Sequence, residues 1–93
     1  MPFWVYMLRC ADESFYVGHS DDLERRYGQH VLGEFPGYTH GRRPLTLVFS
    51  AELPTREAAI EAERRIKGWS RAKKIALIAR DWQTISALGR KKF

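Results

Sequence analysis

The chain has 93 residues and a net charge of +5, with 44% hydrophobic and 13% aromatic residues. This composition is typical of one globular domain and excludes a disordered chain, and the basic balance favours a polyanionic partner such as nucleic acid. The longest apolar run, Phe3 to Leu8, is too short to cross a bilayer, and Cys10 is the only cysteine. Since the start also lacks the basic region of a signal peptide, we expect a cytoplasmic protein without a membrane segment, with residues 1–93 forming one domain.

Two short strands are expected first. Residues 3–9 are aromatic and branched, which is typical of a strand buried on both faces, and residues 15–18 form a second strand after a polar turn. If paired residue numbers across this hairpin have an even sum, Tyr6 and Tyr16 lie on the same face of the sheet, because side chains alternate along a strand. Such a register requires a three-residue turn.

A helix follows the hairpin. Asp21 and Glu24 resemble a capping box at its start, and Gly33 is expected to end it. A spacing of four predicts that its core-facing side consists of Leu23, Tyr27 and Val31.

Arg26 and His30 are four residues apart and therefore lie on one side of this helix. They are beside the apolar stripe, so both can lean over the edge of the sheet. Two interpretations stay open: a solvated helix face, or a pair of groups that contact a phosphate.

The second half contains a loop, a strand and two more helices. Residues 33–44 are punctuated by glycine and proline, residues 45–51 read as a strand, and Thr55 is a candidate N-cap for a helix that ends near Lys67. Ser70 is a candidate cap for the last helix. The expected core stripes are Ala59, Ala62, Ile66 and Trp69 for the first of these helices, and Ile75, Ile78, Ala79 and Trp82 for the second. The order is ββαβαα in an α/β domain, followed by a basic tail at residues 89–93 that we expect to be mobile.

Glu63 borders the core-facing side of its helix, whereas Glu61 lies on the outer side, where it can pair with Arg65. A carboxylate at the border of a core needs a partner, because burying an unpaired charge is costly. The partner is either an arginine or a metal ion. Mg²⁺ commonly takes one or two protein carboxylates and completes its shell with water and substrate phosphate.

Five elements in order over one small domain resemble the GIY-YIG nuclease superfamily: Tyr6, the triplet Tyr16-Val17-Gly18, Arg26, His30 and Glu63. The second triplet is a close match, whereas the first, Trp4-Val5-Tyr6, matches only in its tyrosine. The remaining sequence is similar to the short, stand-alone bacterial branch, which resembles the nuclease part of structure-specific junction endonucleases. Many members carry a late asparagine, and this chain contains none. The resemblance implies a small three-stranded antiparallel sheet flanked by helices.

The resemblance also implies metal-dependent hydrolysis of phosphodiester bonds in DNA, or in RNA, in repair or recombination. Glu63 would hold Mg²⁺ or Mn²⁺, and Arg26 would contact the phosphate. Tyr6 would activate the water with help from His30, and Tyr16 would position the phosphate, although the two tyrosine roles can be exchanged.

A loop with Tyr38, Arg42 and Arg43 either contacts the substrate or is a surface loop whose arginines confer solubility. We expect contact, and add Gly18 and Lys67 to the substrate-binding residues. The competing hypothesis is a nucleic-acid-binding module of the same fold with little catalysis. Because the chain shows no second DNA-targeting domain, a protein partner for targeting is possible.

Overall fold

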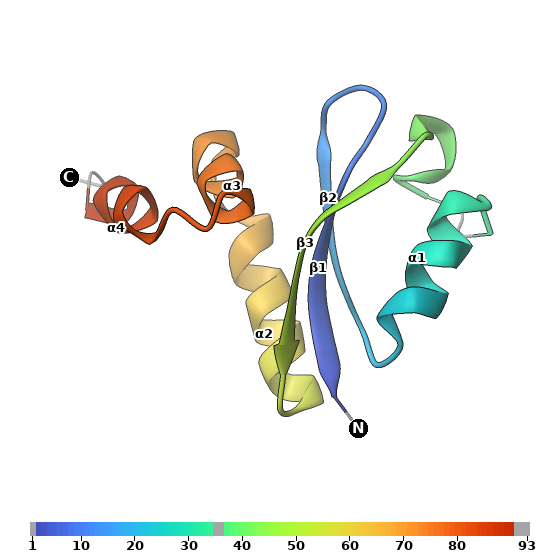
Figure 1. Ribbon diagram of the computed structural model, residues 1–93, viewed down its shortest axis with the longest axis horizontal. Helices are drawn as coiled ribbons and strands as arrows, with labels where there is room; N and C mark the ends of the chain where they lie inside the picture. Colours follow the sequence, from blue (N-terminus) through green and yellow to red (C-terminus); the bar gives the residue numbers. More distant parts are fainter. Residues whose placement is uncertain (1, 35–36, 91–93) are drawn as a thin grey trace.

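The computed structural model describes residues 2–34 and 37–90 (Figure 1). In this part of the chain there are three strands and four α-helices, so the predicted α/β class and the order ββαβαα are confirmed, with the last helical region divided into two helices. A 3-10 turn, η1, precedes the third strand. The elements are β1 (Phe3–Arg9), β2 (Phe15–Ser20), α1 (Leu23–Val31), η1 (His40–Arg42), β3 (Thr46–Leu53), α2 (Arg56–Lys67), α3 (Arg71–Ile78) and α4 (Trp82–Arg90).

The sheet has the order β2-β1-β3, and both pairs of strands are antiparallel. In the β1–β2 hairpin, Tyr6 is opposite Gly18 and Leu8 is opposite Tyr16, around a turn of three residues at 11–13. This is the even-sum register, the one of the alternatives left open by the sequence that places both tyrosines on one face. Tyr6 and Tyr16 therefore lie on the same face of the sheet.

The sheet separates two groups of core side chains, because α1 and α2 lie on opposite sides of it (Figure 1). Along β1, Val5 and Met7 face α2, whereas Tyr6 and Leu8 face α1. All four side chains are at most 2% exposed, so β1 is buried on both faces as expected. The α2 side contains Val5, Met7, Val17, Phe49, Ile66 and Leu77, and the α1 side contains Tyr6, Leu8, Cys10 and Leu45.

Two expectations for α1 are wrong. Its N-cap is Asp22, not Asp21: the Asp22 side chain accepts from the Arg25 amide, while the Ser20 hydroxyl bonds the Asp22 backbone and fixes it there. Val31 is 43% exposed, and His30 is the buried residue instead. The reason is geometric. A step of four residues turns the helix by about 400°, so residues spaced by four drift about 40° away from the buried face at each step. Relative to Leu23, His30 at i+7 therefore stays closer to the buried face than Val31 at i+8.

The predictions for α2 are confirmed. Thr55 caps it by accepting from the Ala58 amide, and Ala59 and Ile66 are buried. Ala62 and Trp69 pack against the same core, as expected. This helix consequently holds Glu63 at the margin of the core.

The stripe predicted for the last helix is largely wrong. Ile75 and Trp82 are 48% and 58% exposed, whereas Ala76 and Leu77 are buried. Arg80 has a positive φ of 55° and ends α3, so no single helical period extends to Trp82.

Gly89 and Arg90, which were expected in the basic tail, belong to α4, and the rest of the predicted tail, residues 91–93, lies outside the described residues. No helix within residues 2–34 and 37–90 has the length and apolar character needed to cross a membrane.

Candidate active site

A chain of three buried polar side chains lies under the α1 face of the sheet. The Tyr6 hydroxyl is 2.9 Å from Nε2 of His30, and Nδ1 of the same ring is 2.9 Å from the Thr39 hydroxyl. The three residues are 1%, 2% and 3% exposed. Buried polar groups of this kind need partners, and each of these supplies one to the next.

The surroundings shift the acidity of both ring systems. Burial raises the pKa of the Tyr6 hydroxyl above its ordinary value of 10.0, and Tyr16 adds to this, whereas the nearby Arg26 guanidinium opposes it. Burial, followed by the charge of Arg26, lowers the pKa of His30 below its ordinary 6.5. At neutral pH the pair is therefore a neutral phenol beside a neutral imidazole, which can accept a proton.

Tyr16 and Gly18 complete this face of β2. The Tyr16 ring centroid is 6.4 Å from that of Tyr6 and 5.1 Å from that of His30. A Cβ atom added at Gly18 would lie 2.5 Å from the Tyr6 hydroxyl oxygen and 2.7 Å from its Cζ. Because Gly18 has no Cβ atom, there is room for the Tyr6 hydroxyl beside it.

Glu63 reaches the same strand from α2. Its Oε1 is 2.6 Å from Nδ1 of His19, and its Oε2 is 2.9 Å from Nζ of Lys67. Burial favours the neutral acid, but the hydrogen bonds and charges of Lys67 and His19 outweigh it and lower the pKa of Glu63. The partners are thus a histidine and a lysine, not the arginine considered from the sequence. Nζ of Lys67 also lies 5.9 Å from the Tyr16 ring, so it links the carboxylate to the tyrosines.

Arg26 and Tyr16 line two different hollows. Arg26 borders one of about 210 Å³ at the start of α1, and Tyr16 borders one of about 370 Å³ with Phe15, Val17, Tyr38, Lys67 and Lys74. The charges of Arg26 and Glu63 both act on the Tyr6 hydroxyl. The Tyr6 hydroxyl thus bonds His30, and the other three predicted catalytic residues influence its acidity.

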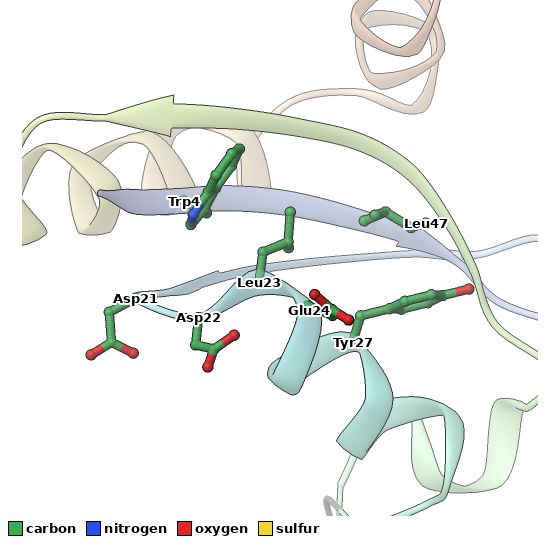
Figure 2. Close-up of a pocket in the computed structure, with 7 residues that line it drawn as sticks. All are labelled: Trp4, Asp21, Asp22, Leu23, Glu24, Tyr27 and Leu47. Carbon is green, nitrogen blue, oxygen red and sulfur yellow. The ribbon is translucent and has the colours of Figure 1, made fainter. Parts of the chain in front are cut away.

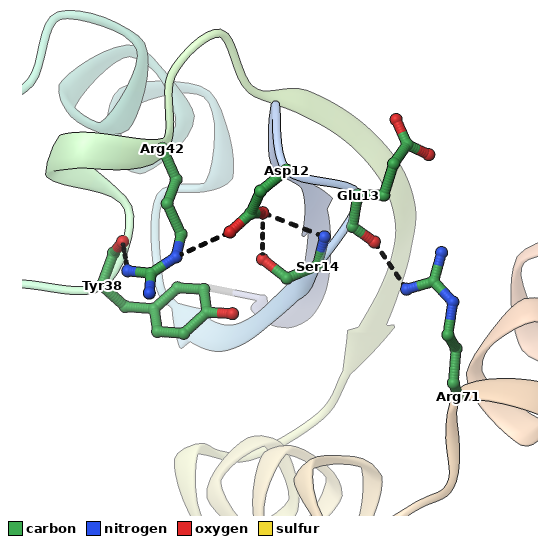
Figure 3. Close-up of polar contacts among 6 residues, drawn as sticks. All are labelled: Asp12, Glu13, Ser14, Tyr38, Arg42 and Arg71. Atoms are coloured by element: carbon green, nitrogen blue, oxygen red, sulfur yellow. Dashed lines mark hydrogen bonds and ion pairs between the residues drawn. The ribbon is translucent and has the colours of Figure 1, made fainter.

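The loop predicted to contact the substrate is tied to the hairpin turn (Figure 3). Asp12 accepts from Ser14 and, at 3.0 Å, from Nε of Arg42. The Arg42 guanidinium donates to the Tyr38 carbonyl and lies 3.9 Å from the Tyr38 ring centroid. Tyr38 stacks in turn on Tyr16, with centroids 6.2 Å apart. Arg42 therefore holds Tyr38 beside the candidate site.

Arg43, the other arginine of this loop, donates from Nε to the His40 carbonyl. Its guanidinium fills the space beside Gly33, where an added Cβ would lie 2.6 Å from Nη1. Gly33 has a positive φ of 73°, which also favours glycine. In this arrangement Arg43 stabilises the loop, and a contact of Arg43 with substrate stays a prediction.

A separate hollow of about 470 Å³ lies between α1 and the sheet (Figure 2). Its floor is apolar, and three carboxylates surround it at the start of α1. Since carboxylates repel phosphate, this hollow does not suit a nucleic acid, and none of the predicted site residues lines it. Its residues are Trp4, Asp21, Asp22, Leu23, Glu24, Tyr27 and Leu47.

The donor set of the candidate site fits a magnesium ion that is held by few protein ligands. No group of three metal-ligating side chains occurs within the described residues. Glu63 is a charged carboxylate with 20% of its side chain exposed, which is a hard oxygen donor that solvent can reach. One carboxylate is compatible with Mg²⁺ where water and substrate phosphate complete the shell.

Residues 2–76 match the family model described as the GIY-YIG catalytic domain. The chain belongs to the GIY-YIG family. All five predicted catalytic residues fall inside the matched region, and a nuclease domain of this kind implies a nucleic-acid substrate.

Similar proteins carry the family label UPF0213. The chain is 45% identical over 76 residues to a UPF0213 protein of Natronomonas pharaonis, covering 82% of this chain and 89% of that protein. It is 41% identical over 78 residues to the UPF0213 protein YhbQ of Escherichia coli, covering 84% and 78%. The solution structure of a UPF0213 protein from Bacillus halodurans is similar with a TM-score of 0.56 and 39% identity, covering 85% of this chain and 84% of that one.

Sequence reasoning missed two residues of the site, His19 and Thr39. An alternation argument can find His19, because odd-numbered residues of β2 face α2 and Glu63 requires a partner there. Thr39 lies in an irregular loop before η1, where no periodicity exists to place it.

Proposed function

We propose that this GIY-YIG protein is a metal-dependent endonuclease that hydrolyses phosphodiester bonds in DNA during repair or recombination. The observation that carries the proposal is the hydrogen bond from the Tyr6 hydroxyl to the buried, neutral His30, with Arg26 and Glu63 close enough to act on the same hydroxyl. A cytoplasmic location is part of the proposal and rests on the lone, free Cys10.

The proton path follows from the buried chain. Because the pKa of Tyr6 is raised, Tyr6 passes a proton on rather than standing as a phenolate. As water attacks phosphorus, its proton moves to the Tyr6 oxygen while the Tyr6 proton moves to Nε2 of His30. For Nε2 to accept, Nδ1 must carry the other proton and donate to Thr39, which the 2.9 Å contact permits.

The phosphate is stabilised by the residues on either side of the tyrosines. Arg26 offers a planar fork of donors to two phosphoryl oxygens, whose charge grows in the transition state. Tyr16 orients the phosphate by a hydrogen bond from its hydroxyl. Glu63 would hold Mg²⁺ or Mn²⁺, which when bound supplies Lewis-acid stabilisation of the leaving oxygen.

The hollow beside Tyr16 supports a nucleic-acid substrate. Its walls combine aromatic rings with the ammonium groups of Lys67 and Lys74, and such surfaces stack on bases and attract phosphates. Tyr38, held by Arg42, presents 42% of its surface and extends the aromatic wall. We propose DNA as the substrate, with RNA as the alternative polymer.

One observation favours a second candidate function, a nucleic-acid-binding module with little catalysis. Both carboxylate oxygens of Glu63 already have partners, and Tyr6 is 1% exposed, so a metal or a substrate would have to displace existing contacts to reach either group. A module of this kind would bind nucleic acid in a salt-dependent manner and leave it intact.

Cleavage of a defined panel separates the two functions. Flaps, forks, four-way junctions, single strands and matched RNAs are incubated with the protein in Mg²⁺, in Mn²⁺ and in chelator. We expect products from at least one DNA only when a metal is present. Salt-sensitive binding to the whole panel without product in either metal would establish the binding module instead.

A further inference from the structure

The two partners of Glu63 differ in how firmly they are held. His19 comes from β2, 44 residues away in sequence, and its Nδ1 lies 2.6 Å from Oε1. Lys67 comes from the next turn of α2, and its Nζ lies 2.9 Å from Oε2. The side chain of His19 is 31% exposed and that of Lys67 is 51% exposed. The carboxylate therefore has one partner that spans two elements and one exposed partner on its own helix.

We propose that His19 is a positioning residue that keeps Glu63 oriented toward a metal ion, and that Lys67 is the exchangeable partner that leaves Oε2 when the metal binds. This inference rests on the proposed function. It gives the two partners of Glu63 different roles, positioning for His19 and exchange for Lys67, which the family match does not specify.

The hydrogen bond to His19 suits a permanent role. A carboxylate oxygen only accepts, so Nδ1 of His19 carries the proton that it shares with Oε1. The ring has few rotatable bonds and sits on a strand, and a donor of this kind fixes a carboxylate without occupying its second oxygen. Groups that hold a metal ligand in this way typically contribute 10- to 100-fold to metal affinity.

The ion pair with Lys67 suits a temporary role. The lysine end of this pair is 51% exposed, and a solvated ammonium four residues away on the same helix contributes only modestly to stability and reorients easily. In the structure the Lys67 ammonium supplies the positive charge at Oε2 of Glu63. The paired ammonium already lies 5.9 Å from the Tyr16 ring centroid, so a substrate phosphate held by Tyr16 would attract it once it leaves Oε2.

The two partners therefore predict effects of opposite sign on metal binding. Replacing His19 by Phe keeps the bulk and removes the donor, so affinity should fall by about 10- to 100-fold. Replacing His19 by Asn keeps an N–H donor near the Nδ1 position and should restore most of the loss. Replacing Lys67 by Gln removes a competing cation, so affinity should rise by about 2- to 5-fold, which is the usual contribution of an exposed ion pair.

The test is a Mn²⁺ titration of the full chain without DNA, followed by paramagnetic broadening of backbone amide signals. Glu63→Gln identifies the broadening that depends on the carboxylate, and thermal denaturation of each variant checks the fold. The expected order of affinity is Lys67→Gln above wild type, then His19→Asn, then His19→Phe.

The outcomes separate this inference from the proposed function. If Glu63→Gln leaves the broadening unchanged, the metal site itself is wrong, and both fail. If Glu63→Gln abolishes it while His19→Phe binds Mn²⁺ as wild type does, only the positioning role of His19 is refuted. If Lys67→Gln weakens binding, the ammonium does not compete with the metal, and its exchange is refuted.

Discussion

A methyl group at Gly18 should damage both the stability and the activity of the protein. In Gly18→Ala the new Cβ would lie 2.5 Å from the Tyr6 hydroxyl, whereas ordinary contacts begin at 3.4 Å, so the hydroxyl must move by about 0.9 Å. Tyr6 is fully buried and cannot move without straining its 2.9 Å bond to His30. Overpacking of this kind costs about 1–3 kcal/mol, which in a chain of this size lowers Tm by roughly 5–20 °C. Misplacing a reacting group by about 1 Å can cost about 100-fold in rate.

The matched control is Gly28→Ala, in which the same methyl group meets nothing within 4 Å. Gly28 lies inside α1, so alanine should stabilise the protein by roughly 0.5–1 kcal/mol. The Tm and the single-turnover cleavage rate are measured for both variants. Gly18→Ala is also made in a Tyr6→Phe background, which tests whether the two positions are coupled. A Gly18→Ala protein with wild-type Tm and wild-type cleavage would refute the packing of Tyr6 against this glycine.

Two further predictions concern Arg26 and His30, which lie beside Tyr6. Arg26→Lys keeps the charge but loses the planar fork of donors, so the single-turnover cleavage rate should fall by about 100- to 1000-fold. The affinity for DNA should stay within a few-fold of wild type. If a loss of DNA binding accounts for all of the lost cleavage, a catalytic role of Arg26 is contradicted. The pKa of His30 is lowered by folding, so the unfolded chain binds more protons just below pH 6.5, and the free energy of unfolding should decrease as pH falls through this range. Urea denaturation at about pH 7.5 and 5.5 should show a smaller decrease for His30→Gln than for wild type, and equal decreases would contradict a buried neutral His30.

Local sequence patterns are sufficient to predict the order of the strands and helices. The hairpin strands and the Ala59 and Ile66 stripe follow from local periodicity, whereas the sequence left the register of the hairpin open. Errors arose where a pattern was carried too far. A stripe of apolar residues alone extends along α1 to Val31, although His30 has the better helical phase and is the buried residue.

The contacts of the candidate site were harder to predict, because they join elements that are far apart in the chain. The His19–Glu63 bond spans 44 residues, and the Tyr6–His30 bond spans 24. Local sequence indicates which residues need a partner, as it did for Glu63, but the partner depends on how α2 crosses the edge strand β2. That crossing is set by packing of the whole core.

The most direct measurement of the central claim compares Glu63→Gln with Glu61→Gln. Both replace a carboxylate of α2 by its neutral isostere, but Glu61 is 69% exposed and pairs with Arg65 on the outer side of the helix. Single-turnover cleavage in Mg²⁺ is measured for both variants on a DNA that the wild-type protein cuts, together with their DNA affinities. We predict that Glu63→Gln loses cleavage while it binds DNA as well as wild type, or slightly more tightly, and that Glu61→Gln cleaves normally. Cleavage by Glu63→Gln at the wild-type rate would contradict the claim that this site hydrolyses phosphodiester bonds.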